Sequence, residues 1–157
     1  MELLNIRKLT IKDLDLLIKL RIDFLLDEKI EFTSNELDSI KNKCKDYFLS
    51  AINTNSFIAY IAEEKGEILS VAFMTLTERP PRKAFTSTRI GTVYNVLTYE
   101  KHRRKGIATK LLHTLLDEAK SIGVSTIDLY ATTDGEKLYE NLGFWKINYT
   151  PMRLDFL

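Results

Sequence analysis

At 157 residues the chain has the length of one domain, and we expect a single domain over residues 1–157 with one substantial core. Its 23 Lys and Arg balance 22 Asp and Glu, so the overall charge favours neither nucleic acid nor an anionic membrane. A single cysteine excludes an internal disulfide. No signal-peptide pattern and no apolar run of membrane-spanning length occur, so we expect a cytoplasmic protein.

The amino-terminal third predicts a strand followed by two helices. Residues 3–8 alternate weakly and predict the strand. Thr10 and Asp13 resemble a capping arrangement, and apolar residues at helical spacing follow them. Thr33 and Glu36 form a clearer capping box, which predicts the start of the second helix.

Cys44 lies in the apolar stripe of that second helix. One interpretation is a catalytic thiol, and the other is a small core residue. No histidine lies nearby in a pairing motif, so we favour the core residue.

The middle of the chain predicts a hairpin, a loop and a buried strand. Ser56–Ala62 and Glu67–Thr77 are rich in aromatic and β-branched residues and flank the turn Glu63–Gly66, which predicts the hairpin. The proline-containing segment Glu78–Thr88 predicts the loop. Ile90–Thr98 predicts a central strand that is buried on both faces.

The clearest helix of the sequence begins near Gly106 and ends near Gly123. Ser125–Ala131 predicts a short strand after it. Strand, helix and strand at this spacing predict a βαβ unit with parallel strands and a right-handed crossover. Thr133 and Glu136 then form another capping box, which predicts a short helix.

The end of the chain predicts a hairpin. The short helix stops at Gly143, and Phe144–Ile147 and Tyr149–Asp155 read as its two strands. The pattern leaves open whether three aromatic residues pack in the core or against a dimer partner: Trp145, Tyr149 and Phe156.

The turn between the buried strand and the clearest helix has the composition of a phosphate site. Backbone N–H groups in the first turn of a helix have no intrahelical partner, and the helix dipole is positive there. Arg103, Arg104 and Lys105 add charge, while Gly106 and Ala108 leave room for a close approach. An ordinary solvated charge cluster is the alternative. Neither G-x-x-x-x-G-K-S/T nor G-x-G-x-x-G occurs, and no Cys/His cluster predicts a metal site.

Two segments about thirty residues apart resemble the signatures of the GCN5-related N-acetyltransferases. Arg103, Gly106 and Ala108 fit the acyl-CoA-binding pattern Q/R-x-x-G-x-G/A, and Leu138–Phe144 fits the second signature, LYExxGF. The order of predicted elements also matches along essentially the whole chain. The resemblance implies an α+β fold. Its central sheet is mixed and mostly antiparallel, with about six to seven strands flanked by about four helices, and a splayed parallel βαβ unit holds acyl-CoA.

The resemblance further implies how acetyl-CoA is held. Its pyrophosphate would meet the N–H groups of Arg104–Thr109 with Arg103 beside them, and its pantetheine arm would lie along Val96–Thr98 like an added strand. A backbone N–H near Val96 or Leu97 would polarise the acetyl carbonyl. The hydroxyl of Thr132 would serve where many relatives carry Asn. The implied cofactor-binding residues are Val96, Leu97, Thr98, Arg103, Arg104, Lys105, Gly106, Ile107, Ala108, Thr109 and Thr132.

Tyr139 is the implied catalytic residue. In the resembled family a tyrosine at this place faces the sulfur of coenzyme A and protonates the departing thiolate. Its position between Leu138 and Leu142 on a helix is also compatible with core packing or with simple contact to the sulfur.

The implied reaction moves an acetyl group from acetyl-CoA to a primary amine of a small molecule or peptide, by direct attack in a ternary complex. It implies no metal, no nucleic-acid or membrane partner, and a monomer or homodimer. The alternative is a non-catalytic acyl-CoA-binding sensor or interaction module of the same fold.

The general base is not assigned, because the strand Val93–Leu97 contains no carboxylate. Asn95 or Tyr94 could position substrate or water, but an amide takes no proton. An acidic run near the first helix–helix junction offers other candidates and hints at a cationic acceptor: Asp27, Glu28 and Glu31.

Overall fold

The structure is a computed structural model, and it describes residues 3–84 and 86–156. One sheet has the strand order β1-β2-β3-β4-β5, with neighbours antiparallel except for β4 and β5, which are parallel. The strands are β1 (Asn5–Lys8), β2 (Phe57–Glu64), β3 (Glu67–Glu78), β4 (Arg89–Thr98) and β5 (Thr126–Asp128). The α-helices are α1 (Leu14–Asp27), α2 (Ser34–Asn53), α3 (Ile107–Ser121) and α4 (Glu136–Asn141), with short 3-10 turns at Ile11–Asp13 and Glu100–His102.

The α+β fold with a mixed, mostly antiparallel sheet is confirmed. The described sheet has five strands, fewer than the six to seven expected. The difference lies at the carboxyl terminus, where the predicted hairpin of Phe144–Ile147 and Tyr149–Asp155 is wrong. Residues 145–156 belong to no helix or strand and pair with no strand of the described sheet.

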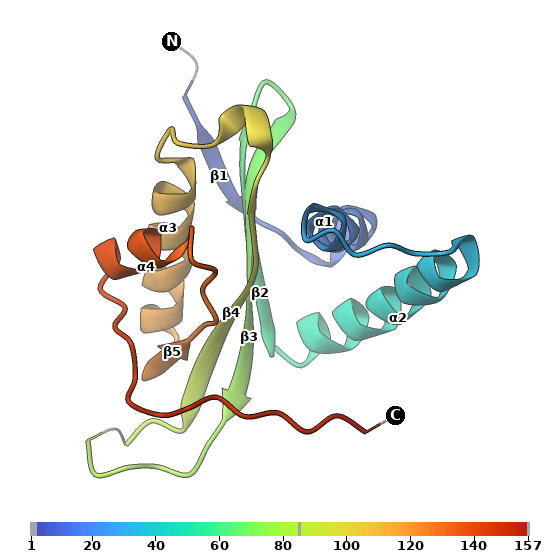
Figure 1. Cartoon of the computed structure of the whole chain (residues 1–157). Coiled ribbons are helices and arrows are strands. Elements are labelled where there is room, and N and C mark those ends of the chain that lie inside the picture. Colours follow the sequence, from blue (N-terminus) through green and yellow to red (C-terminus); the bar gives the residue numbers. More distant parts are fainter. Residues whose placement is uncertain (1–2, 85, 157) are drawn as a thin grey trace.

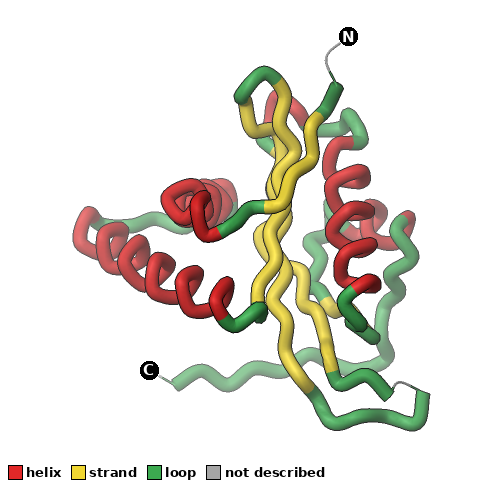
Figure 2. Tube along the Cα trace, turned by 180° about the vertical axis from the view of Figure 1, so that it is seen from behind, coloured by secondary structure: helices red, strands yellow, loops and turns green. Residues whose placement is uncertain are grey.

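Helices cover the sheet on both faces, α1 and α2 on one and α3 and α4 on the other (Figure 1; the view from behind is in Figure 2). Each face has its own apolar core. The α3 core includes Leu111, Leu112 and Leu115, all fully buried. The core under α1 and α2 is rich in aromatic rings, with Phe48 packed against Phe57 and Phe73. Two-sided burial is what the nearly continuous apolar runs of the central strands require.

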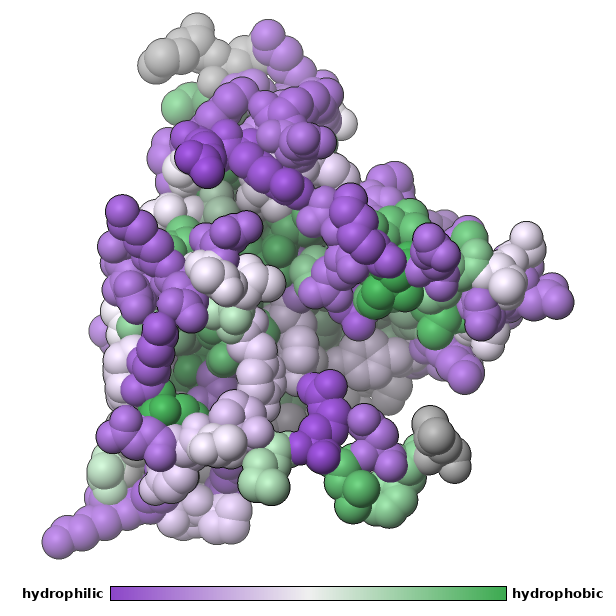
Figure 3. All heavy atoms as spheres, in the orientation of Figure 1, coloured by the Kyte–Doolittle hydropathy of each residue, from purple (hydrophilic) through white to green (hydrophobic). Residues whose placement is uncertain are grey.

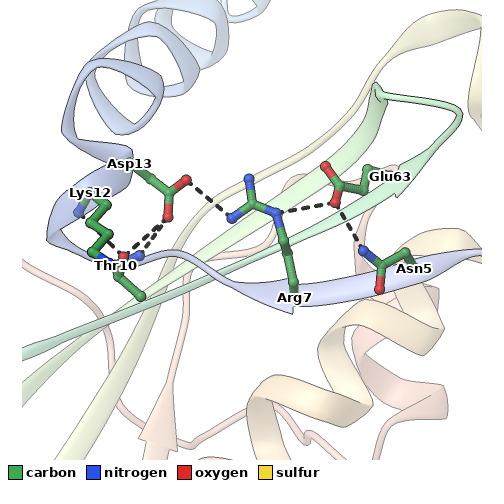
Figure 4. Close-up of polar contacts among 6 residues, drawn as sticks. All are labelled: Asn5, Arg7, Thr10, Lys12, Asp13 and Glu63. Atoms are coloured by element: carbon green, nitrogen blue, oxygen red, sulfur yellow. Dashed lines mark hydrogen bonds and ion pairs between the residues drawn. The ribbon is translucent and has the colours of Figure 1, made fainter.

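The predicted caps at the two amino-terminal helices are confirmed. Thr33 and Glu36 exchange side-chain and backbone hydrogen bonds at the start of α2. The Thr10–Asp13 box opens the 3-10 turn before α1. Figure 4 shows that Asp13 also accepts a hydrogen bond from Arg7, so the edge strand β1 is tied to the start of α1.

Asn95 marks a β-bulge in β4. Leu97 pairs with Val71 and Tyr94 pairs with Phe73, so two residues of β4 lie opposite one residue of β3. Asn95 has a φ of +56°, in the left-handed region that asparagine tolerates better than most residues. An extra residue on one strand bends it and increases its local twist.

The bulge also exchanges the faces of the residues that follow it. In a regular strand Val93 and Leu97 would point to the same side of the sheet. Here Val93 and Val96 pack in the α3 core, whereas Leu97 packs in the core under α1 and α2. The bulge therefore lets one strand supply apolar residues to both cores.

The parallel pair β4–β5 separates soon after it forms. Ile90–Thr92 pairs with Thr126–Asp128, and β5 ends there. β4 continues to Thr98 with no partner on that side among the described residues. The predicted splay of the βαβ unit is therefore present, and its gap opens toward the turn that leads into α3.

Candidate functional site

The turn before α3 presents a series of backbone N–H groups. Arg104 and Gly106 have φ of +61° and +73°, and left-handed residues of this kind turn successive N–H groups toward a common concavity. The N–H groups of residues 104–109 make no hydrogen bond to any described residue, and the first helical bond is donated by Lys110 to the carbonyl of Gly106. Free donors at a helix start can bind an anion such as phosphate.

Arg103 does not stand free beside this turn. Its Nε donates to the carbonyl of Thr98 at 2.8 Å, and its Nη2 donates to Oδ1 of Asp27 at 2.9 Å. It thereby joins the end of β4 to the end of α1. The side chains of Arg104 and Lys105 are exposed and form no ion pair with a described residue, so they are available to an approaching anion.

Two side chains just before Arg103 form ion pairs of their own. Lys101 and His102 both contact the carboxylate of Glu67, at the β2–β3 hairpin. The hydrogen bond from Lys101, and after it the one with His102, lowers the pKa of Glu67. Lys101 and His102 therefore belong to a surface ion-pair network with Glu67. The basic side chains that remain available to a ligand are those of Arg104 and Lys105.

The three residues predicted to line the pantetheine arm differ in their surroundings. Val96 packs at the edge of the α3 core, on the same side as Tyr139. The side chain of Leu97 is buried under α1 and α2, and its carbonyl accepts a hydrogen bond from the hydroxyl of Ser70. The carbonyl of Thr98 accepts from Arg103, as described above, and all three residues lie in the part of β4 that is not paired with β5.

Tyr139 of α4 lies against the α3 core and is half-buried. Its ring meets Phe144 edge-on at 5.9 Å between centroids. Burial raises the pKa of Tyr139, and its hydroxyl makes no hydrogen bond to a described residue. The phenol is therefore protonated at neutral pH and able to donate.

Thr132 and Gly135 shape the approach to α4. The predicted capping box of Thr133 and Glu136 is wrong, because Gly135 precedes the helix and its N–H is bonded to both the carbonyl and the hydroxyl oxygen of Thr132. A Cβ on Gly135 would lie 3.3 Å from both the Tyr139 ring and the Thr132 hydroxyl. Sequence reasoning missed Gly135, whose only local signal is the turn dipeptide Asp-Gly.

The side chain of Asn95 serves α1. It is 3 % exposed, its amide donates to the carbonyl of Leu20 at 3.4 Å, and its oxygen accepts from Nη1 of Arg21 at 3.1 Å. Both hydrogen bonds of the Asn95 side chain are thus made to residues of α1, and one of them positions the guanidinium of Arg21.

Arg21 is the cation of a half-exposed cluster between α1, α2 and β4. Its guanidinium lies over the ring of Phe24, 5.5 Å from the centroid. Burial raises the pKa values of Cys44 and Tyr47, and the charge of Arg21 opposes both shifts. Arg21 forms no ion pair with a carboxylate among the described residues. Cys44 packs at the edge of the aromatic core, as predicted for a core residue.

The three candidate bases fare differently. The carboxylate of Asp27 forms an ion pair with the guanidinium of Arg103. Glu28 and Glu31 are exposed beyond the end of α1. Within residues 3–84 and 86–156, no group of three or more His, Cys, Asp or Glu side chains could hold a metal ion, and no helix is long and apolar enough to cross a membrane.

Known proteins resemble this chain in sequence and in fold. The family model described as Acetyltransferase (GNAT) family matches residues 22–144. A predicted acetyltransferase from Clostridium acetobutylicum, crystallised with acetyl-CoA, is 31 % identical with a TM-score of 0.85, over 98 % of this chain and 96 % of that one.

More distant solved structures share the fold. A GCN5-related N-acetyltransferase from Ralstonia eutropha JMP134 is 22 % identical with a TM-score of 0.78, over 96 % of this chain and 98 % of that one. Glucosamine-6-phosphate N-acetyltransferase from Arabidopsis thaliana is 20 % identical with a TM-score of 0.67, over 98 % and 99 %. A search of curated proteins finds no match.

Proposed function

Since the chain belongs to the GNAT family of acetyltransferases, we propose that it moves an acetyl group from acetyl-CoA to a primary amine of a small molecule or peptide, in a ternary complex. The observation that carries this proposal is the run of six free N–H groups, residues 104–109, at the mouth of the β4–β5 gap. One domain over residues 1–157 would hold both substrates, in the cytoplasm and without a metal.

The chain's own groups supply the steps as follows. The N–H groups of residues 104–109 bind the pyrophosphate, with Arg104 and Lys105 adding charge. A backbone N–H near Val96, at the bulge, polarises the acetyl carbonyl. The amine nitrogen then forms a bond to the carbonyl carbon as the carbon–sulfur bond breaks.

Two protons have to move in this reaction. The hydroxyl of Tyr139 gives its proton to the leaving thiolate and regains one from solvent. The attacking amine loses a proton through water, because the described part of β4 places no carboxylate in the gap. The raised pKa of Tyr139 supports its role as the acid, since the phenol stays protonated where an amine is reactive.

Binding and turnover test this proposal separately. Titration calorimetry with acetyl-CoA should show saturable binding, and a free-thiol assay over a panel of amines should show acetyl-CoA consumed with at least one of them. Absence of binding at millimolar acetyl-CoA would overturn the acyl-CoA site. Binding without thiol release from any amine would favour the sensor or interaction module, for which the missing carboxylate in β4 is the supporting observation.

The Arg21 cluster supports an acceptor that carries an anionic group, rather than the cationic one suggested by the acidic run. A guanidinium fixed by Asn95 and free of carboxylates offers a charge-assisted hydrogen bond to a carboxylate. We expect an amino acid to be acetylated with a KM about 10-fold lower than that of its amide, matching one such bond. Arg21→Gln should abolish the difference, and Lys41→Gln, an exposed position on α2, should keep it. Equal KM values for acid and amide in the unaltered enzyme would contradict this assignment.

A further inference from the structure

A groove lies between α1 and α2, apart from the residues of the proposed acetyl-transfer site. Its volume of about 480 Å³ is within the range of small-molecule sites. Two isoleucines form its apolar part, of which Ile22 is buried and Ile18 is half-buried. Figure 3 shows that the layer of these two helices exposes apolar surface between hydrophilic side chains. Eight residues line the groove: Asp15, Ile18, Lys19, Ile22, Asp23, Lys41, Asn42 and Lys45.

The groove uses a different face of α1 from the one that packs on the sheet. Its residues at positions 15, 18, 19, 22 and 23 recur at helical spacing, which places them on one side of the helix. Leu17 and Leu20, which are fully buried in the core under α1 and α2, lie on the other side. Neither Arg21 nor residues 104–109 line the groove. A change in the groove should therefore leave acetyl transfer unaltered, as expected above for Lys41→Gln.

The two carboxylates of the groove are stabilised without a ligand. Asp23 accepts a hydrogen bond from the ammonium group of Lys19 and another from the hydroxyl of Tyr99, each at 2.5 Å. Asp15 lies in the first turn of α1, where the helix dipole favours a negative charge. These two groups therefore do not require a cation from outside the chain.

Two lysines of the groove have no such compensation. Lys41 and Lys45 place like charges one turn apart on α2, an arrangement that destabilises a helix. Both are exposed, and neither forms an ion pair with a described residue. The side-chain amide of Asn42, from the same helix, also forms no hydrogen bond with a described residue. The α2 side of the groove thus offers three side chains with available N–H donors.

We propose that this groove binds a small amphipathic monoanion, an apolar chain that ends in a carboxylate. The carboxylate accepts charge-assisted hydrogen bonds from Lys41 and Lys45. The apolar chain covers Ile18 and the exposed part of Ile22. Three lysines against two aspartates give the groove one net positive charge. That charge matches a carboxylate better than a phosphate monoester, which carries nearly two negative charges at neutral pH.

Titration calorimetry with octanoate tests the groove without any acetyl transfer, so its result is independent of the proposed function. Octanoate should bind saturably at one site. Octylammonium, which has the same chain and the opposite charge, should bind at least about 10-fold more weakly, because the lysines repel it. Butyrate, which lacks four of the CH₂ groups, should also bind at least about 10-fold more weakly, since each fully buried CH₂ group contributes about fourfold in affinity. No saturable binding at millimolar octanoate, or equal binding of octylammonium, would overturn the proposal.

Two double variants locate the bound anion. Lys41→Gln with Lys45→Gln should weaken octanoate binding at least about 10-fold, as expected for the loss of a hydrogen bond from a charged group. Lys43→Gln with Lys120→Gln removes the same charge from exposed positions outside the groove and should leave the affinity unchanged. Glutamine is as good a helix former as lysine, and thermal denaturation verifies that both variants are folded. Equal octanoate affinities in the two variants would reject the groove.

A third variant and backbone amide chemical shifts separate the groove from the acetyl-transfer site. Arg21→Gln should bind octanoate as tightly as the unaltered chain. Addition of octanoate should shift the amide signals of residues 15–23 and 41–45. Loss of binding in Arg21→Gln, or signals that shift only in residues 92–98 and 104–109, would place the anion in the acetyl-transfer site and reject the groove.

Discussion

Tyr139→Phe should lower kcat about 100-fold, the lower end of the contribution of a positioned proton donor. The substitution removes one hydroxyl and keeps the ring that packs on Phe144 and the α3 core. Acetyl-CoA affinity should therefore stay within about twofold, since packing and phosphate contacts are unchanged. Steady-state kinetics with calorimetric titration of acetyl-CoA measures both quantities.

The pH dependence follows from the same burial. Because the pKa of Tyr139 is raised above its ordinary value of 10.0, its proton stays on between pH 7 and 9. We expect no loss of kcat from this group in that range. Tyr130→Phe, an exposed tyrosine just beyond β5, is the matched control and should keep full activity. If the kcat of Tyr139→Phe were within threefold of that of the unaltered enzyme, Tyr139 would not be the proton donor. Contact with the sulfur would then be its remaining role.

Gly106→Ala should weaken acetyl-CoA binding about 30-fold, as expected when one or two charge-assisted hydrogen bonds are lost. Gly106 has a φ of +73°, and an added Cβ would meet no heavy atom of the protein within 4 Å. The substitution therefore acts through the backbone angle of the turn and through the space that a bound phosphate needs.

Gly66→Ala is the control for the strain alone. Gly66 lies in the β2–β3 turn with a φ of +77°, and a Cβ there also meets nothing within 4 Å. Both variants should lose about 1–2 kcal/mol of stability, the cost of left-handed backbone with a Cβ. Thermal denaturation measures whether the two variants lose the same stability. Titration with acetyl-CoA should show weaker binding only for Gly106→Ala. Equal affinities in the two variants would place the phosphate away from residues 104–109.

Local patterns in the sequence were sufficient to predict the helix and the βαβ unit at the proposed phosphate site. Apolar spacing in α3 and the strand before it predicts the βαβ unit. The left-handed backbone of Arg104 and Gly106 was not predicted. The Thr33–Glu36 box is equally local, because both partners lie within one helical turn. Such features need no knowledge of the rest of the chain.

Contacts between distant residues carry no such signal. Arg21 and Asn95 are 74 positions apart, and Arg103 and Asp27 are 76 apart. Nothing near any one of them indicates its partner. The bulge had one local sign, an asparagine inside an apolar strand, which is unusual enough to suggest irregular backbone.

The terminal hairpin failed for a different reason. Alternation predicts a strand on each side of Pro151, but the apolar positions change from odd to even there, so the alternation does not specify one face that packs on the sheet. The prediction assumed a partner within the same chain. In the described structure the segment has none, although its pattern is that of a paired strand.

Arg103, at the turn before α3, joins the end of β4 to the end of α1 through Thr98 and Asp27. Because of this link, the binding of a ligand at the turn before α3 and the ordering of the last turn of α1 are coupled equilibria. A ligand that draws Arg103 toward a phosphate leaves Asp27 unpaired, and a ligand that holds Asp27 elsewhere releases Arg103. The free energy of this coupling is equal in both directions. In the proposed function, acetyl-CoA at the turn and an acceptor at the end of α1 would thus change each other's affinity through a single guanidinium.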